Sequence, residues 1–226
     1  MTTTVIVPTF NEIECIPHIL PKLRDLQGVD KIIIVDNNSK DGTIEWCKSH
    51  GYTIFIQKNP GYGNAIREAV ERASGDILID FPPDGSSPSE KIPVMVEKIE
   101  QGLDLIIASR YRDGAKSYDD DTLTALGNWC FTKLTNFLFN TTYTDVLVGF
   151  RGYRKSAYRT LKLNEPHLAW VIQSSIRFAT HGYKVGEIGA DEPKRIGGKR
   201  KMLPFKTGLE ILTVILREFF QKPPKS

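Results

Sequence analysis

The first half of the chain alternates short apolar runs with segments of helical periodicity, and this alternation constrains the fold more than any other feature. Continuous apolar strands that alternate with helices are typical of a parallel sheet covered by helices on both faces. The sequence therefore predicts an α/β protein with a mostly parallel central sheet. The predicted strands are Thr4–Val7, Lys31–Val35, Tyr52–Ile56, Asp76–Ile79 and Leu103–Ala108. The predicted helices are Glu14–Leu26, Thr43–His50, Asn64–Ala73 and Ile92–Glu100.

The second half of the chain has a less regular pattern. We expect residues 1–205 to form a single domain and residues 206–226 to add an amphipathic helix with a basic tail. The elements predicted in this half are a helix at Leu123–Phe139, a strand with a turn at Asp145–Tyr153, a helix at Ala169–His181 capped by Gly182, a strand at Lys184–Ile188 and a helix at Lys206–Phe220.

Composition and charge exclude several classes of protein. A length of 226 residues is enough to bury a full core without staples, and a net charge of +3 is too small to indicate nucleic-acid binding. Cys15, Cys47 and Cys130 are far apart and lack metal-ligand spacing, which fits a reducing compartment. The N-terminus lacks the features of a signal peptide, and residues 208–220 are too short and too charged to span a bilayer. We therefore expect a cytoplasmic protein.

The segment Asp80–Pro88 indicates chemistry at the edge of the predicted sheet. It follows a strand, and the carboxyl ends of strands in open α/β sheets are where ligands bind. A carboxylate at that edge, such as Asp84, can hold Mg2+ or Mn2+, and the metal can neutralise a diphosphate. Turn statistics alone favour the other interpretation, in which Pro83, Asp84 and Gly85 only form a turn.

Several motifs occur in an order that resembles a known family. The motifs lie at residues 7–12, 35–43, 61–67, 84–85, 108–110 and 149–153. Together they resemble family 2 glycosyltransferases with the Rossmann-like GT-A fold, in the branch of dolichol-phosphate mannosyltransferase and bacterial polyprenyl-phosphate glycosyltransferases. The resemblance extends from about Thr4 to Lys201. Gly61 and Gly63 do not form a dinucleotide loop, because they follow the third strand and a third glycine is missing.

The resemblance implies a site for a nucleoside-diphosphate sugar. GDP-mannose is familiar for the family, and UDP-sugars are equally consistent with this sequence. Simpler roles stay open: Glu12 as a charge at a helix N-terminus, Asp36 as a cap or turn residue, and Arg67 as a solvated helix charge. Asp41 is expected to be structural. The residues implied for this donor site are Pro8, Thr9, Phe10, Glu12, Asp36, Gly63, Arg67 and Asp84.

The metal motif departs from the family pattern. The family has two aspartates that flank one residue, often with a glutamine two positions on, and Pro82, Asp84 and Ser86 stand at these positions here. The resemblance then implies that Asp84 and Ser86 hold Mg2+ or Mn2+ with help from the diphosphate and water. Asp80 is a candidate helper, and the alternative is that it belongs to the other face of its strand, away from the metal. Asn37 replaces a second family aspartate.

The resemblance also implies catalytic and acceptor residues. Asp84, Arg110 and Arg195 are expected to act in catalysis by stabilising the departing diphosphate. The reaction expected is an inverting sugar transfer to a polyprenyl phosphate, which needs no general base. The alternatives are a glycan or small hydroxyl acceptor, for which Gln173 in place of an acid is a difficulty, and a nucleotide-binding domain without activity. The residues implied for the acceptor are Asp145, Arg151, Trp170, Gln173, Arg200 and Lys201.

The C-terminal helix allows several partners. Its apolar residues and flanking lysines suit a membrane interface, but a helix of this length packs as readily on its own domain or in a homodimer. A lipid-phosphate acceptor would require peripheral membrane contact in either case, directly or through a membrane-protein partner.

Overall fold

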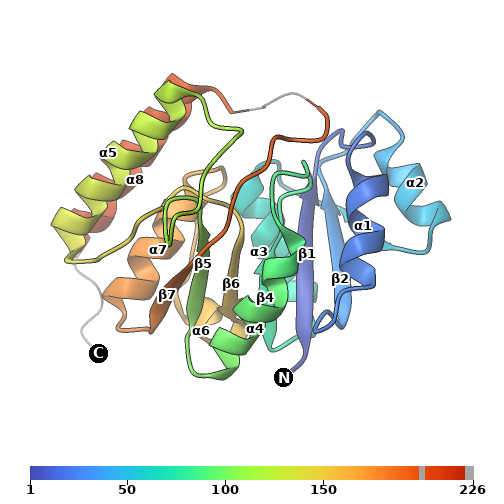
Figure 1. The fold of residues 1–226 in the computed structure, drawn as a ribbon, viewed down its shortest axis with the longest axis horizontal. Helices are drawn as coiled ribbons and strands as arrows, with labels where there is room; N and C mark the ends of the chain where they lie inside the picture. Colours follow the sequence, from blue (N-terminus) through green and yellow to red (C-terminus); the bar gives the residue numbers. More distant parts are fainter. Residues whose placement is uncertain (199–201, 222–226) are drawn as a thin grey trace.

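The computed structural model describes residues 1–198 and 202–221. They form a seven-stranded sheet of order β3-β2-β1-β4-β6-β5-β7 (Figure 1). All the strands are parallel except β6, which pairs antiparallel with β4 and β5. The strands are β1 (Thr3–Thr9), β2 (Lys31–Asp36), β3 (Thr53–Ile56), β4 (Ile77–Asp80), β5 (Leu105–Ser109), β6 (Arg151–Arg154) and β7 (Val185–Gly189).

Helices cover both faces of this sheet. In Figure 1, α1 and α4 lie on the near face, and α3 and α7 lie on the far face. The helices are α1 (Ile16–Arg24), α2 (Thr43–Ser49), α3 (Tyr62–Arg72), α4 (Ile92–Glu100), α5 (Thr122–Phe139), α6 (Lys155–Thr160), α7 (Trp170–Thr180) and α8 (Pro204–Phe220), with a 3-10 turn, η1, at Ser89–Lys91.

The alternation of side chains along β6 shows how helices α4 and α7 pack on opposite faces of the sheet. A Cβ on Gly152 would lie 3.2 Å from Ile99 of α4, whereas the ring of its neighbour Tyr153 lies 6.4 Å from the ring of Trp170 of α7. The small residue therefore admits α4 on one face, and the aromatic residue packs under α7 on the other. Both Tyr153 and Trp170 are completely buried.

The predicted α/β class and the mostly parallel sheet are confirmed, and most predicted elements agree with the structure to within two residues. The prediction for Asp145–Tyr153 is wrong in part, because only Arg151–Arg154 is a strand and residues 145–150 are irregular. Helix α6 was missed, since six residues are too few to show a helical period. Helix α8 begins at Pro204, two residues before the predicted start of the C-terminal helix at Lys206.

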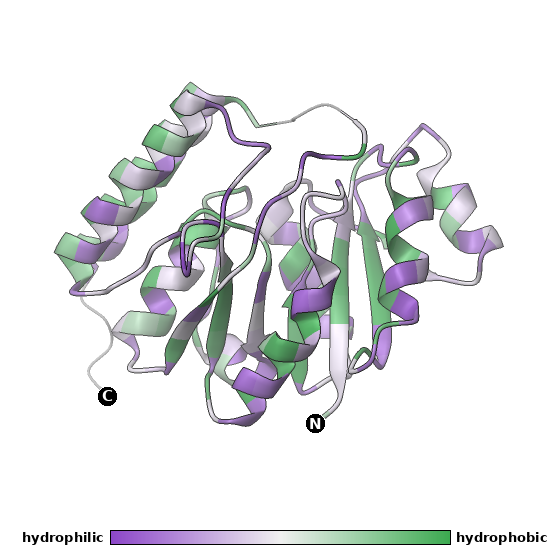
Figure 2. Ribbon diagram, viewed as in Figure 1, coloured by the Kyte–Doolittle hydropathy of each residue, from purple (hydrophilic) through white to green (hydrophobic). Residues whose placement is uncertain are grey.

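Helices α5 and α8 lie side by side at one end of the molecule (Figure 1), and both carry many apolar residues (Figure 2). The rings of Phe139 and Phe219 pack edge to face with centroids 6.2 Å apart. The buried residues of α5 are polar, namely Asn128, Thr132 and Thr135. Other apolar residues of α5, including Phe131 and Leu134, are partly buried against the core. The helix therefore departs from the usual pattern of a surface helix in the polar residues that it buries and the apolar residues that it exposes. Its exposed apolar residues are Leu123, Leu126, Trp129 and Phe137, and those of α8 are Phe205, Leu209, Leu212, Leu216, Phe219 and Phe220.

Candidate active site

A cleft of about 490 Å³ opens at the carboxyl edge of the sheet. One wall comes from the loops that follow β1 and β4, and the other comes from the start of α8 and the loop before α7. Prolines and short polar residues end the strands here, so the backbone turns away and leaves the edge open. Among the lining residues are Pro8, Thr9, Phe10, Glu12, Asn37, Gln57, Tyr62, Asp84, His167, Arg195, Lys206 and Glu210.

Pro8, Thr9, Phe10 and Glu12 line this cleft as the resemblance implied, but Asp36 lies behind them. Its side chain is completely buried. Oδ2 of Asp36 accepts hydrogen bonds of 2.7 Å from the hydroxyls of Thr9 and Ser39. Asp36 therefore joins the loops that follow β1 and β2 and fixes Thr9 at the rim of the cleft.

Gly63 and Arg67 hold the far wall rather than the cleft itself. A Cβ on Gly63 would overlap the carbonyl oxygen of Glu165 and lie 2.8 Å from Cβ of Trp170. Arg67 donates to the same carbonyl at 3.2 Å and also binds Asn64. The small residue and the arginine together bring helix α3 against the loop that carries His167.

Asp84 forms a structural turn and also reaches the cleft with its carboxylate. Its Oδ1 accepts from the amide of Ser86 at 3.1 Å and from the Ser86 hydroxyl at 2.7 Å, which is the structural turn. Gly85 has φ +81°, and a Cβ there would lie 2.5 Å from Ile196. The carboxylate nevertheless remains 20% exposed and lines the cleft. Ser86 is buried and directs its hydroxyl to Asp84.

Arg195 reaches Asp84 from the segment that follows β7. Its Nη2 lies 3.2 Å from Oδ2 of Asp84 and 3.1 Å from Oδ2 of Asp119. Burial acts to lower the pKa of Arg195, but its hydrogen bonds to Asp119 and the negative charges of both carboxylates outweigh burial and raise the pKa above the usual value. A permanently charged guanidinium therefore stands beside the carboxylate in the cleft.

No group of three histidine, cysteine or acidic side chains suited to a metal occurs within residues 1–198 and 202–221. Asp84 is the one candidate carboxylate on the loop after β4. A hard cation such as Mg2+ accepts one or two carboxylates and completes its shell with phosphate oxygens and water. The oxygens of Asp84 fit a cation that arrives with a diphosphate, and they do not form a closed protein cage.

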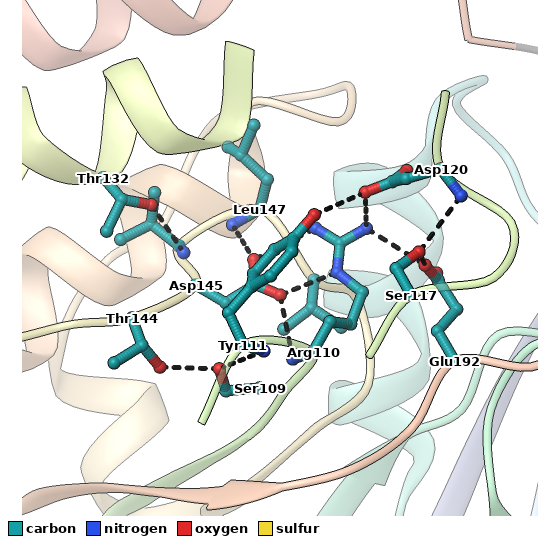
Figure 3. A network of polar contacts seen from close by, with 12 residues as sticks. Ser109, Arg110, Tyr111, Ser117, Asp120, Thr132, Thr144, Asp145, Leu147 and Glu192 are labelled. Carbon is teal, nitrogen blue, oxygen red and sulfur yellow. Dashed lines mark hydrogen bonds and ion pairs between the residues drawn. The ribbon is translucent and has the colours of Figure 1, made fainter. Parts of the chain in front are cut away.

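Arg110 lies in a buried cluster away from the lining of the cleft (Figure 3). Its Nε is 2.7 Å from Oδ2 of Asp145, and its Nη1 is 2.9 Å from Asp120 and 3.4 Å from Glu192. Burial disfavours the charge on both Arg110 and Asp145. Their mutual attraction outweighs that effect, so the pKa of Arg110 is raised well above its usual value and the pKa of Asp145 is lowered. These contacts favour a positioning role for both residues.

Three further residues implied for the acceptor are completely buried: Arg151, Trp170 and Gln173. Arg151 donates at 2.8 Å to the carbonyl of Val171. Gln173 donates at 2.8 Å to Glu218 and so ties α7 to α8. All three are therefore placed in the interior and not in the lining of the cleft. Arg200 and Lys201 lie outside the described residues.

Asp80 lies in the core with its carboxyl group below the site. It is completely buried, and its Oδ1 accepts at 2.8 Å from the hydroxyl of Tyr153. Among the described residues, Oδ2 has no hydrogen-bond partner. Burial raises the pKa of this carboxyl group from 3.8 to about 8, although Tyr153 and Arg151 act to lower it. Burial therefore favours the neutral form of Asp80, and its contacts in the core do not place it as a metal ligand.

Sequence interpretation missed His167, Gln57, Glu210 and Asp119. His167 and Gln57 have no motif around them, and Glu210 faces the cleft only because α8 begins beside it. Asp119 lies in the acidic run 119–121, and the pattern of that run did not distinguish the residue that meets Arg195. The sequence alone does not show that Asp119 and Arg195 are neighbours, because they are 76 residues apart along the chain.

Known proteins support this architecture. Residues 4–162 match the model of Glycosyl transferase family 2. The undecaprenyl-phosphate mannosyltransferase of Micrococcus luteus is 27% identical over 215 residues, which cover 89% of this chain and 88% of that protein. The dolichyl-phosphate hexose transferase of Haloferax volcanii is 28% identical over 208 residues, which cover 92% and 89%.

A solved structure confirms the fold. Glucosyl-3-phosphoglycerate synthase from Mycobacterium tuberculosis, in complex with Mn2+, UDP and phosphoglyceric acid, superposes with a TM-score of 0.76 at 19% identity and covers 100% of this chain and 80% of that chain. None of the helices within the described part of the chain is long and apolar enough to cross a membrane. Because the family match covers well over half of the sequence, the chain belongs to glycosyl transferase family 2 and is a glycosyltransferase with the GT-A fold.

Proposed function

We propose that the protein is an inverting glycosyltransferase that moves a sugar from a nucleoside-diphosphate sugar to a polyprenyl phosphate. The observation that carries this proposal is the pairing of Asp84 with Arg195, at 3.2 Å, within a cleft at the carboxyl edge of the sheet. A carboxylate suits a cation that travels with a diphosphate, and a guanidinium suits the diphosphate itself. Relatives named for undecaprenyl and dolichyl phosphates support the choice of acceptor.

The donor is a GDP- or UDP-sugar. Phe10 is 40% exposed on the rim of the cleft and offers an aromatic surface to a base. Glu12 and Gln57 add polar groups to the lining of the same cleft. The structural neighbour that holds UDP and Mn2+ supports a donor of this class.

Asp84, supported by Ser86, is the residue that would hold Mg2+ or Mn2+. When bound, the cation would supply neutralisation of the diphosphate charge. Ser86 would act on this ion through Asp84, because its amide and hydroxyl both donate to that carboxylate. The affinity for the metal is therefore expected to depend strongly on the nucleotide.

The chemical step is a displacement at the anomeric carbon of the sugar. A phosphate oxygen of the acceptor forms the new bond, the bond from the anomeric carbon to the diphosphate breaks, and the nucleoside diphosphate leaves with the electron pair. Arg195 stabilises the negative charge that grows on the leaving group. A phosphate monoester is ionised near neutral pH, since its second pKa is about 6, so no general base is required and Gln173 is no obstacle.

A lipid-linked acceptor requires a site close to a membrane, and the surface of α5 and α8 supports peripheral contact. Trp129, Phe205 and Leu209 are each more than half exposed. Soluble proteins rarely expose many large apolar residues together unless they bind a partner or a membrane. Helix α8 also lines the cleft with Lys206 and Glu210, so the same helix connects this surface to the donor site.

Sugar transfer to a short polyprenyl phosphate, measured with GDP- and UDP-sugars and Mn2+, tests the proposal. We expect transfer with one donor class and a loss of at least about 100-fold in turnover for Asp84→Ala, the size expected when a main electrostatic group is removed. Asp76→Ala, on an exposed carboxylate far from the cleft, is the matched control. Transfer to hydroxyl compounds alone would reject the acceptor, and unchanged turnover of Asp84→Ala would reject the proposed role of that residue.

A further inference from the structure

Residues 116–120 run alongside residues 191–195 beyond the edge of the sheet. The amide of Tyr118 donates to the carbonyl of Glu192 at 2.8 Å, and the amide of Glu192 donates to the carbonyl of Lys116 at 2.9 Å. Ser117 and Glu192 form a parallel bridge. These backbone bonds hold the two segments in a fixed register, which places the next residue, Asp119, opposite Arg195.

The side chain of Asp119 contacts both the backbone and the side chain of Arg195. Oδ1 of Asp119 accepts from the amide of Arg195 at 3.3 Å, and Oδ2 accepts from Nε at 3.3 Å and from Nη2 at 3.1 Å. The side chains are partly buried, with 12% of Asp119 and 24% of Arg195 exposed. Asp119 therefore occupies the Nε side of the guanidinium, and none of its described contacts uses Nη1.

The buried Arg110 cluster anchors both segments that make this pair. Nη1 of Arg110 contacts Asp120, which follows Asp119, and also Glu192, which lies on the segment leading to Arg195 (Figure 3). The buried guanidinium of Arg110 thus connects the two paired segments, residues 116–120 and 191–195. This gives Arg110 a structural connection to the site that it does not line.

We propose that Asp119 is the positioning residue of the catalytic arginine, holding Arg195 while its guanidinium exchanges Asp84 for the diphosphate of the donor. This inference rests on the proposed function. Oδ2 of Asp84 is engaged by Nη2 of Arg195 at 3.2 Å, so the carboxylate cannot turn fully to a cation until that contact loosens. Asp119 keeps the Nε side fixed during the exchange and leaves the Nη edge to face phosphate oxygens, the fork geometry that suits them.

If Asp119 positions Arg195, a substitution at Asp119 should change nucleotide affinity only when Arg195 is present. Without a carboxylate at position 119, Asp84 becomes the single described carboxylate partner of the guanidinium, which then competes with the cation and the diphosphate for it. Asp119→Asn should weaken binding of UDP or GDP in the presence of Mn2+ by roughly tenfold, within the range of coupling between residues in direct contact. Asp119→Glu should recover part of this loss.

A double-mutant cycle tests the inference by calorimetry, with UDP and GDP each titrated in the presence of Mn2+. We expect Asp119→Asn to lose affinity in the wild-type background and to have no further effect in the Arg195→Ala background, with an unchanged melting temperature. Asp113→Asn, an exposed aspartate of the same loop, is the matched control. The inference would be overturned by an equal loss of affinity in both backgrounds or by no loss in either. A lowered melting temperature that Asp119→Glu does not rescue would also overturn it. Failure of the wild-type protein to bind both nucleotides would instead reject the proposed function.

Discussion

Tyr153 donates its hydroxyl to Asp80 at 2.8 Å, and both side chains are completely buried beneath the cleft. The partners of this pair come from adjacent antiparallel strands, β4 and β6. The ring of Tyr158 stacks on Tyr153, and the ring of Trp170 packs against Tyr153 at a tilt. A buried acid in such surroundings is held in its neutral form.

The first prediction concerns pH. Folding raises the pKa of Asp80 from 3.8 to about 8, so the native state binds a proton between these values that the unfolded state does not bind. Stability from this group is fully present below pH 4 and is lost as pH rises toward 8, by up to about 1.4 kcal/mol per pH unit. Asp80→Asn mimics the neutral acid and should remove this dependence. Urea unfolding of both proteins from pH 5 to 8 measures the difference, and parallel pH profiles would contradict it.

The second prediction concerns the buried ion pair of Arg110 and Asp145. Arg110→Met leaves the completely buried carboxylate of Asp145 without its partner. Breaking such a pair costs about 3–5 kcal/mol, so the free energy of unfolding should fall by that amount. Adding Asp145→Asn should recover part of it, because the unpaired charge is gone. Arg24→Met removes an exposed pair with Asp25 and should cost less than about 1 kcal/mol in the same denaturation measurements. Equal losses for Arg110 and Arg24 would contradict the prediction.

Local sequence patterns predicted most of the sheet, because β1, β2, β4 and β5 each contain a continuous apolar run. Strand β6 has no such run, and its bounds were predicted less well. Local patterns also predicted that Asp84 lies at the carboxyl edge, since a strand end and a turn motif are local features. They could not predict which way a charged side chain points. Arg110 follows β5 much as Asp84 follows β4, but Arg110 turns inward to Asp145, 35 residues further along the chain. That direction is set by long-range packing.

The same limit explains why the sequence did not predict the burial of the residues implied for the acceptor or the pairing of Arg195 with Asp119. Trp170 and Gln173 lie on the buried face of α7, and the helical pattern alone does not say whether polar residues there meet a ligand or another helix. Gln173 meets Glu218 of α8. Asp119 meets Arg195 across a separation of 76 residues, a proximity that follows from the order of β5 and β7 in the sheet and from no local motif.

The third prediction concerns Gly63. A Cβ at this position would overlap the carbonyl oxygen of Glu165 and crowd Trp170, so Gly63→Ala must push α3 away from the loop that carries His167. We expect a loss of about 1–3 kcal/mol of stability, as for other overpacked sites, and weaker nucleotide binding. Gly127→Ala, in an open part of helix α5, should instead gain about 0.5–1 kcal/mol. Thermal unfolding with and without UDP or GDP measures both effects. A neutral Gly63→Ala would show that α3 and this loop separate easily.

The last prediction concerns the apolar surface of α5 and α8. Trp129 is 59% exposed and Phe205 is 84% exposed, so charging them should leave the core intact. If these side chains enter a lipid interface, each contributes up to about 1.5–3 kcal/mol of transfer free energy. The double variant Trp129→Glu, Phe205→Glu should therefore lose most of its flotation with liposomes that contain anionic lipids. Val94→Glu, on exposed α4 at the other side of the fold, is the control for added charge. Flotation that survives the double variant would reject a membrane role for this part of the surface.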